Sequence, residues 1–396
     1  MRVADFSRVL AGPFCTRTLC DLGAEVVKIE PPEGDLSRKL GARRAGMSGY
    51  YMQQNCGKLN VSIDLKTERG RELAAAVIAR SDVLVENFRP GVMDGLGLGP
   101  AAMTAAHPGL VYCSISGFGH RSPWRDRRAF AGIAHASTGV LLRQARAMHT
   151  EPTDSVLALG DTVSGLQAVI AILAALRLRE TSGRGQVIDM AMHDALLSIQ
   201  EAANFHLFSD ETGEEDYLCS WVYRCGEEFV ALPTDPRASW PEVCAAMGMP
   251  EHLDDPRYDS YEKREARLDE LEALVQGWVA GVGSADAVVA RLHEHGLPAA
   301  RLASLGEALE SEQARVRDMT PEVDDRSGRR VPVLNTPYRF SSAAAGVRGV
   351  AAFRGEDNRR VLADLLGIDD AEVERLEADG IVSARVPQQR KSSDGD

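Results

Sequence analysis

Strand-like and helix-like patterns of apolar residues alternate along roughly the first 120 residues of the chain. Short runs rich in Val, Ile and Leu, each long enough for one buried strand, lie at residues 25–30, 60–65, 81–88 and 110–117. Segments with helical spacing separate them. This alternation predicts a parallel sheet with helices on both faces, a doubly wound α/β fold. Ligands of such sheets bind at the loops that follow the strands.

A long apolar run, residues 166–178, follows the acidic residue Asp161. The run is hydrophobic nearly all round, which is typical of a buried helix. Asp161 stands near its start, and Asp is a favoured N-cap because its side chain accepts a backbone N–H of the first helical turn. A carboxylate nucleophile or base is the other interpretation. The local sequence favours the cap and leaves the second interpretation open.

The pattern changes after about residue 205. Residues 223–232 predict a β-hairpin around Gly226. Three helices are then predicted at residues 240–247, 268–282 and 285–295. This mixed region, residues 206–325, is our candidate for a smaller α+β domain that follows a large domain at residues 1–205.

The last part of the chain combines one strand-like segment with two helical ones. The strand character lies at residues 331–340, and the predicted helices lie at residues 359–366 and 371–379. Residues 387–396 contain no large apolar side chain to bury, so we expect this tail to be disordered.

The amino-acid composition indicates what kind of protein this is but does not indicate which reaction it catalyses. The chain has 396 residues, of which 44% are hydrophobic and 26% charged, as in soluble globular proteins. A net charge of −13 argues against a general nucleic-acid binder, which needs a basic surface. The predicted helix after Asp161 is too short for a membrane span and is interrupted by Arg177 and Arg179. We therefore expect a cytoplasmic protein with no membrane segment and no signal peptide.

Motif searches among the remaining residues exclude several chemistries. The seven cysteines form no CxxC pair and have no histidine at metal-ligand spacing, so no metal site is expected. The glycines of residues 95–99 lack the spacing of a dinucleotide loop. Three histidines lie near the predicted sheet loops, namely His120, His135 and His193. Composition and spacing alone thus indicate an α/β enzyme of unspecified chemistry.

Several stretches, taken together and in order, resemble the class III CoA-transferase family, which includes formyl-CoA transferase, carnitine CoA-transferase and α-methylacyl-CoA racemase. The resemblance extends to about residue 383. The stretches are RVLAGPF from Arg8, DLGAEVVKIEPP from Asp21, Gly34-Asp35, Gly57-Lys58, DLKT from Asp64, DVLVENFRPG from Asp82, SISGFG from Ser114, Gly160-Asp161, and GRGQ from Gly183.

The resemblance implies a fold, an activity and an assembly. The large domain would be built from both ends of the chain, with residues 326–386 returning to it, and two chains would interlock as a homodimer. Asp161 would be the catalytic carboxylate, which transfers CoA from an acyl-CoA donor to a small carboxylic acid through covalent aspartyl intermediates. Coenzyme A would be a substrate, and no tightly bound cofactor is implied.

The resemblance also implies a CoA site at the sheet loops. By motif position its residues would be Leu10, Ala11, Ile63, Asp64, Leu65, Lys66, Asn87, Phe88, Arg89 and Arg128. The three cations among them would face the nucleotide phosphates. Pro31 and Gly95 occupy positions where some transferases carry CoA-binding arginines, so the phosphate contacts must differ here.

Two departures from the family pattern bear on the reaction. The racemases carry a histidine proton carrier where this chain has Phe130, and a phenyl ring cannot move a proton. Leu10 replaces the glutamine of formyl-CoA transferase, and together with Phe130 and Ala131 it indicates a less polar acyl pocket. An isomerase with Asp161 as base, and with His135 or His120 as a displaced partner, is the alternative. A non-catalytic CoA-binding subunit is a third possibility. The loop 117–119 is the expected source of N–H donors for oxyanions.

Overall fold

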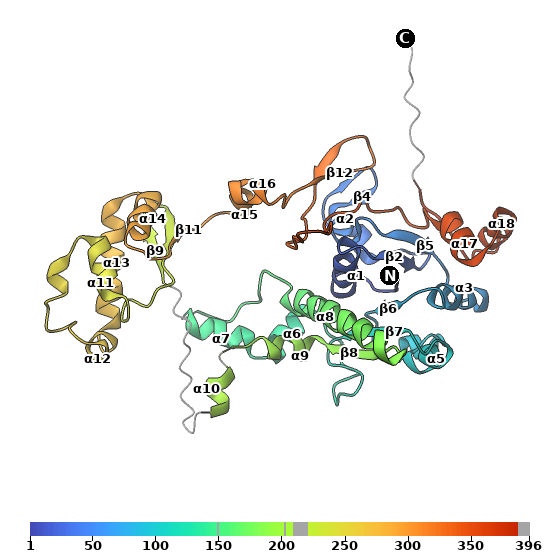
Figure 1. Ribbon diagram of the computed structural model, residues 1–396, viewed down its shortest axis with the longest axis horizontal. Helices are drawn as coiled ribbons and strands as arrows, with labels where there is room; N and C mark the ends of the chain where they lie inside the picture. The colour runs from blue at the N-terminus through green and yellow to red at the C-terminus, as the bar shows by residue number, and fades with distance from the viewer. Residues whose placement is uncertain (149, 202, 209–220, 387–396) are drawn as a thin grey trace, which may run out of the picture. The chain divides into compact units, whose positions relative to one another are not determined.

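The computed structural model describes residues 1–148, 150–201, 203–208 and 221–386, and these form two compact units. The first unit comprises Met1–Leu142, Thr153–Glu201 and Gln313–Asp396, so it draws on both ends of the chain. The second comprises Arg143–Pro152 and Ala202–Glu312. Figure 1 shows the elements of each unit along the chain. The predicted disordered tail, residues 387–396, lies outside the described residues.

A six-stranded sheet with parallel pairing throughout forms the centre of the first unit, and its strand order is β5-β2-β1-β6-β7-β8. The strands are β1 (Arg2–Asp5), β2 (Glu25–Glu30), β5 (Leu59–Ser62), β6 (Val83–Glu86), β7 (Val111–Ser116) and β8 (Val187–Ala191). The order runs outward in both directions from the neighbouring strands β1 and β6. This is a doubly wound sheet, and the prediction of the fold class is confirmed.

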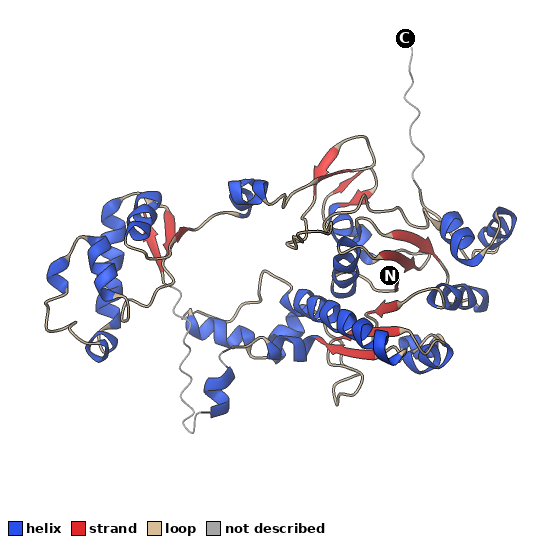
Figure 2. Cartoon of the chain, viewed as in Figure 1, coloured by secondary structure: helices blue, strands red, loops and turns tan. Residues whose placement is uncertain are grey.

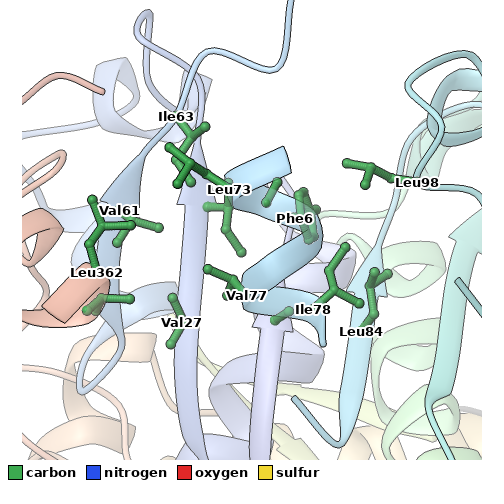
Figure 3. Close-up of a cluster of buried hydrophobic side chains, with 14 of the residues drawn as sticks. Phe6, Val27, Val61, Ile63, Leu73, Val77, Ile78, Leu84, Leu98 and Leu362 are labelled. Carbon is green, nitrogen blue, oxygen red and sulfur yellow. The ribbon is translucent and has the colours of Figure 1, made fainter. Parts of the chain in front are cut away.

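Alternate side chains of each strand enter two different cores, as a sheet covered on both faces requires. In β6, Leu84 belongs to one core, while Val83 and Val85 belong to the other. The first core is drawn in Figure 3 and packs the sheet against α3 (Glu68–Ile78), α5 (Pro100–Ala106), α17 (Asn358–Leu366) and α18 (Asp370–Ala378). The second packs it against α1 (Ala11–Asp21), α6 (Ala131–Ser137), α8 (Leu159–Ser182) and α9 (Met192–Ser198).

The second unit is a smaller α+β structure with its own apolar core. The predicted hairpin is present as β9 (Val222–Cys225) and β10 (Glu228–Ala231), and Gly226 takes the left-handed φ of 64° that the turn requires. A third strand, β11 (Ala300–Arg301), pairs with β10. The core helices are α11 (Trp240–Met247), α13 (Leu268–Val282) and α14 (Ala285–Glu294), close to their predicted bounds.

Shorter elements complete the described chain (Figure 2). They are η1 (Leu36–Lys39), β3 (Arg43–Arg44), β4 (Met47–Ser48), α2 (Gly49–Asn55), α4 (Val92–Gly95), α7 (Val140–Ala147), α10 (Ala203–Phe208), η2 (Pro250–His252), α12 (Tyr261–Glu265), α15 (Leu305–Glu310), α16 (Glu312–Val316), β12 (Glu322–Asp324) and β13 (Arg330–Pro332). The predicted strand at residues 331–340 is wrong beyond Pro332. The prolines at 332 and 337 lack the N–H that a longer ladder needs.

Helix α8 differs from its prediction in length and in burial. It has 24 residues and begins at Leu159, so by length and composition it could cross a bilayer, and the prediction that it is too short was wrong. Only one face is buried: Ala168 and Ile172 are inaccessible, whereas Ile170 is 62% exposed. A single apolar helix packed in a core is weak evidence for a membrane span.

Candidate active site

The loops that follow β1 and β6 are joined to each other at the point where the strand order diverges. The backbone N–H of Arg8 donates to Asn87 Oδ1 at 2.7 Å, and Asn87 Nδ2 donates back to the carbonyl of Arg8 at 2.8 Å. Ligands of doubly wound sheets bind at this switch point. The reciprocal bonds therefore give Asn87, a predicted CoA-site residue, a second role in holding the first loop.

Val9, at the tip of that loop, has a strained backbone. Its φ is 66°, a left-handed value that a β-branched residue rarely adopts. The carboxylate of Asp35 accepts its N–H, with distances of 3.2 and 3.3 Å to the two oxygens. Such strain persists only where surrounding contacts fix the conformation, and it concentrates at functional sites. Helix α1 begins two residues later, so the strained turn sets the direction of its N-terminus.

Two buried ion pairs lie under the loop. Lys28 Nζ is 3.1 Å from Asp35 and donates to the carbonyl of Ser7 at 2.7 Å, while Lys58 Nζ is 3.1 Å from Asp5. Burial alone would raise the pKa of both carboxyls, but the lysines and neighbouring hydrogen-bond donors outweigh it and hold each pKa below its ordinary value. These charges form a rigid base for the loop.

Asp161 lies in the first turn of α8 but does not cap that helix. The N-cap position is Ala158, which makes no side-chain bond, so the interpretation of Asp161 as an N-cap is wrong. Asp161 Oδ1 instead accepts the backbone N–H of Ala11 at 3.3 Å, and the backbone N–H of Ala131 faces the carboxylate and helps to lower its pKa. Ala11 and Ala131 are the first residues of α1 and α6. The partly positive ends of helices thus meet at one carboxylate.

The environment of Asp161 favours a reactive carboxylate. Partial burial raises its pKa more than the backbone N–H groups of Ala11 and Ala131 lower it, so the net shift is upward. Within the described ranges, no lysine or arginine is paired with it. A carboxylate that is shielded from water but not neutralised by a cation keeps its nucleophilicity.

Apolar residues immediately precede the two backbone N–H groups that face this carboxylate. Leu10 and Phe130 are the N-cap residues of α1 and α6, each immediately before a residue whose N–H reaches Asp161. Phe130 is 75% exposed. The backbone near the catalytic candidate thus carries a leucine and a phenylalanine rather than polar residues.

The other predicted CoA-site residues differ in exposure: some are buried in the sheet core and others are exposed at the loops. Ile63 is inaccessible and packs in the sheet core, so its side chain contributes structure. Lys66 is exposed and 3.1 Å from Glu33, and Arg89 and Arg128 are exposed at the loops that follow β6 and β7. The guanidinium of Arg8 lies over the Phe88 ring, 5.1 Å from its centroid.

Neither His135 nor His120 is placed to act as the second proton carrier that the isomerase alternative needs. His135 is buried with both ring nitrogens bonded, Nδ1 to Asp154 and Nε2 to the N–H of Gly160. His120 Nε2 is 2.7 Å from Ser114 Oγ. The expected N–H source at residues 117–119 is also partly wrong, because the N–H of Gly119 donates to Ser116 Oγ at 3.0 Å.

Sequence reasoning missed several residues of the site. Asp154 carries no motif, and the support that Asp35 gives to Val9 depends on a fold that only the structure shows. The Gly34-Asp35 pair was a visible signal without an assigned role. Among the described residues, no group of three or more His, Cys, Asp or Glu side chains is arranged to hold a metal ion.

A doubly wound α/β sheet with an unneutralised carboxylate at its switch point is an arrangement suited to binding a small molecule. The sequence model of CoA-transferase family III matches residues 1–358. The chain is 30% identical to the succinyl-CoA–D-citramalate CoA-transferase of Chloroflexus aurantiacus, over 96% of this chain and 97% of the relative. It is also 30% identical to the formyl-CoA:oxalate CoA-transferase of Streptomyces avermitilis, over 96% and 98%.

Solved structures agree with these sequence relationships. A CaiB/BaiF family protein from Brucella suis superposes with a TM-score of 0.80 at 30% identity, covering 92% of this chain and 98% of that one. Rv3272 from Mycobacterium tuberculosis gives a TM-score of 0.79 at 29% identity, covering 90% and 96%. The chain belongs to family III of the CoA-transferases and is a CoA-transferase. The isomerase alternative is not favoured.

Proposed function

We propose that this enzyme moves CoA from an acyl-CoA to a small carboxylic acid through covalent intermediates on Asp161. The observation that carries the proposal is the carboxylate itself. It is partly buried at the switch point, free of a paired cation, bonded to the N–H at the start of α1 and faced by the N–H at the start of α6. A nucleophile needs this combination of fixed orientation and incomplete neutralisation.

The reaction divides into four displacements. A carboxylate oxygen of Asp161 attacks the acyl carbonyl and expels CoA thiolate, leaving a mixed anhydride. The thiolate attacks the aspartyl carbonyl, releases the donor acid and forms an aspartyl-CoA thioester. The acceptor carboxylate attacks this thioester and again expels thiolate. The thiolate then attacks the acceptor carbonyl, which yields the new acyl-CoA and free Asp161. Two displacements thus occur at the aspartyl carbon.

The N–H groups of Ala11 and Ala131 are suited to these two displacements. They already point at Asp161 in the resting enzyme. When the aspartyl carbon becomes tetrahedral, negative charge develops on the oxygen that they hold. Donors fixed in place before the reaction stabilise such charge without a cost of reorganisation.

We infer that the acyl site accepts acids with an apolar portion. Leu10 and Phe130 immediately precede the residues whose N–H groups face Asp161, and their side chains offer no hydrogen bond to a polar chain end. The named relatives act on succinyl-CoA with citramalate and on formyl-CoA with oxalate. Comparing kcat/KM across short polar and longer aliphatic acids would test this inference. A clear preference for oxalate would contradict it.

The proposed cations for the CoA phosphates are Lys66, Arg89 and Arg128. Each is exposed at a loop of the first unit. Substituting Lys66 or Arg89 by alanine should raise KM for the acyl-CoA by about 3- to 10-fold with little change in kcat. Arg360→Ala, on the exposed surface of α17, is the control and should change neither constant.

We also propose that a second copy of the chain covers the outer face of α8. Leu166, Ile170, Leu173 and Leu178 on this helix are between 38% and 62% exposed, which is unusual for a long apolar helix. Light scattering should show twice the chain mass, and Ile170→Glu should shift the protein towards the monomer. A wild-type monomer at micromolar concentration would refute the dimer.

The covalent step is tested by mass spectrometry of the intact protein after incubation with a panel of acyl-CoAs. Wild-type protein should gain a hydroxylamine-sensitive CoA adduct, and Asp161→Ala should gain none. Incorporation of deuterium at the α-carbon of an acyl-CoA without any acceptor acid would favour the isomerase instead.

A further inference from the structure

His135 is a buried titratable residue that the proposed reaction does not use. It lies in α6, and its side chain is 1% exposed. Nδ1 is 2.8 Å from Asp154 Oδ1, and Nε2 is 3.1 Å from the backbone nitrogen of Gly160. A backbone N–H can only donate, so Nε2 must carry a lone pair, and the proton of the neutral ring must lie on Nδ1. The ring therefore accepts from Gly160 and donates to Asp154.

The bond to Gly160 compensates for the missing side-chain cap of α8. The first N–H groups of a helix have no acceptor within the helix, and the side chain of the N-cap residue Ala158 offers none. His135 supplies an acceptor from another helix. Gly160 is the residue immediately before Asp161, so this bond fixes the turn that carries the carboxylate.

Helices α6 and α8 pack closely where His135 bonds Gly160, so a small shift of either helix would break this bond. A Cβ added at Gly160 would lie 3.1 Å from Ala131 Cα, so α6 and α8 approach closely at this point. Ala131 also carries one of the backbone N–H groups that face Asp161. His135 thus ties the helix that bears the carboxylate to the helix that bears its donor.

Asp154 orients the ring from the other side. A Cβ at Gly132 would come within 2.6 Å of Asp154 Oδ2, so the glycine leaves room for the carboxylate above α6. The Asp154 side chain is 60% exposed, and solvent weakens its bond to His135. Its influence on the ring should be smaller than that of the buried Gly160 contact.

We propose that His135 is a positioning residue, which holds Gly160 so that the Asp161 carboxylate stays aligned with the N–H groups of Ala11 and Ala131. This role rests on the proposed function of Asp161. If His135 has this role, any side chain that places a hydrogen-bond acceptor at the position of Nε2 should replace it, and the imidazole ring itself is not needed. Glutamine can supply such an acceptor, because its amide oxygen extends about as far from the backbone as Nε2.

The test compares His135→Leu with His135→Gln. Leucine fills the space but offers no acceptor, so kcat for CoA transfer should fall by about 10- to 100-fold while KM for the acyl-CoA stays within about twofold. Glutamine should restore kcat to within about fivefold of wild type. Amide hydrogen exchange at residues 159–162 should rise in the leucine variant and return towards normal in the glutamine variant.

The outcomes separate the two claims. Equal kcat for wild type and His135→Leu, or no rescue by glutamine in a folded variant, would overturn the positioning role alone. A wild-type chain that never transfers CoA through Asp161 would overturn the proposed function. Asp154→Asn, which keeps an oxygen acceptor for Nδ1, should change kcat by less than about threefold. A larger loss than that of His135→Leu would show that Asp154, not the acceptor for Gly160, governs the site.

Discussion

Asp35 and Asp161 flank the same short stretch of chain, residues 9–11, but they are stabilised in opposite ways. Asp35 is fully buried beside Lys28 and accepts the N–H of Val9. Asp161 is partly buried, lacks a paired cation, and accepts the N–H of Ala11. The pKa of Asp35 is lowered, because Lys28 and its donors outweigh burial, whereas burial leaves the pKa of Asp161 raised. The first carboxylate supports the fold, and the second is left available for chemistry.

The largest expected effect comes from replacing each carboxylate by its amide. Asp161→Asn should lower kcat by about 10³-fold or more, because an amide oxygen is a poor nucleophile. Its melting temperature should not fall, since the substitution removes a charge that burial disfavours. Asp35→Asn should instead lower the melting temperature, because buried Lys28 would lose its ion-pair partner and keep only the more distant charges of Asp5 and Glu30. Equal destabilisation of the two variants would contradict the comparison.

Removing a buried cation tests the supporting network directly. Lys58→Met leaves Asp5 and the acceptors on Pro13, Thr16 and Asn55 without their donor. We expect a loss of about 3–5 kcal/mol in the free energy of unfolding, measured by urea denaturation. Lys66→Met removes an exposed pair with Glu33 and serves as the control, with no measurable change expected.

Glu86, at the end of β6, is a buried acid like Asp35, but it has no paired lysine. Burial raises its pKa to about 7, although Ser114 and the N–H of Phe88 donate to it. A raised folded-state pKa means that stability is present below the ordinary glutamate value and is lost as the pH rises through about 7.

Glu86→Gln should therefore be more stable than wild type above pH ~7, by up to about 3 kcal/mol, and similar to it near pH ~4.5. Thermal melts over this range would measure the difference. The exposed Glu310→Gln is the control and should show no such pH dependence. A Glu86→Gln variant that is less stable at every pH would contradict the account.

The smallest expected effect concerns the pH below which the enzyme loses activity, which should be higher than for an ordinary aspartate. Asp161 must be ionised to attack, and its raised pKa means that ionisation is lost at a higher pH than for an ordinary aspartate. As the pH is lowered, log kcat/KM should therefore begin to fall at a pH above the ordinary pKa of an aspartate. A profile that stays flat down to the ordinary value would place Asp161 in a more polar environment than the structure shows.

Much of the fold could be predicted from the sequence. Apolar runs located β2, β5, β6 and β7, and the glycine at 226 located the hairpin, because such features depend on neighbours along the chain. The exposed face of α8 could not be predicted, since an all-round apolar helix gives no sign of which side lacks a partner within its own chain. The boundary at Pro332 was missed although the prolines were visible.

The candidate site was predictable only in part. Asp161 was identified by resemblance, while its local sequence favoured a cap that the structure does not contain. Its true partners, Ala11 and Ala131, are distant in sequence and act through backbone N–H groups, which leave no mark on residue identity. The contact between His135 and Gly160 has the same character.

The covalent role of Asp161 is tested most directly by peptide mapping of the enzyme after incubation with an acyl-CoA that it uses. The account predicts that CoA is attached through a thioester at Asp161, is released by hydroxylamine, and is absent from Asp161→Asn. A wild-type enzyme that turns over the same acyl-CoA with no adduct at Asp161, or with the adduct at another residue, would contradict it.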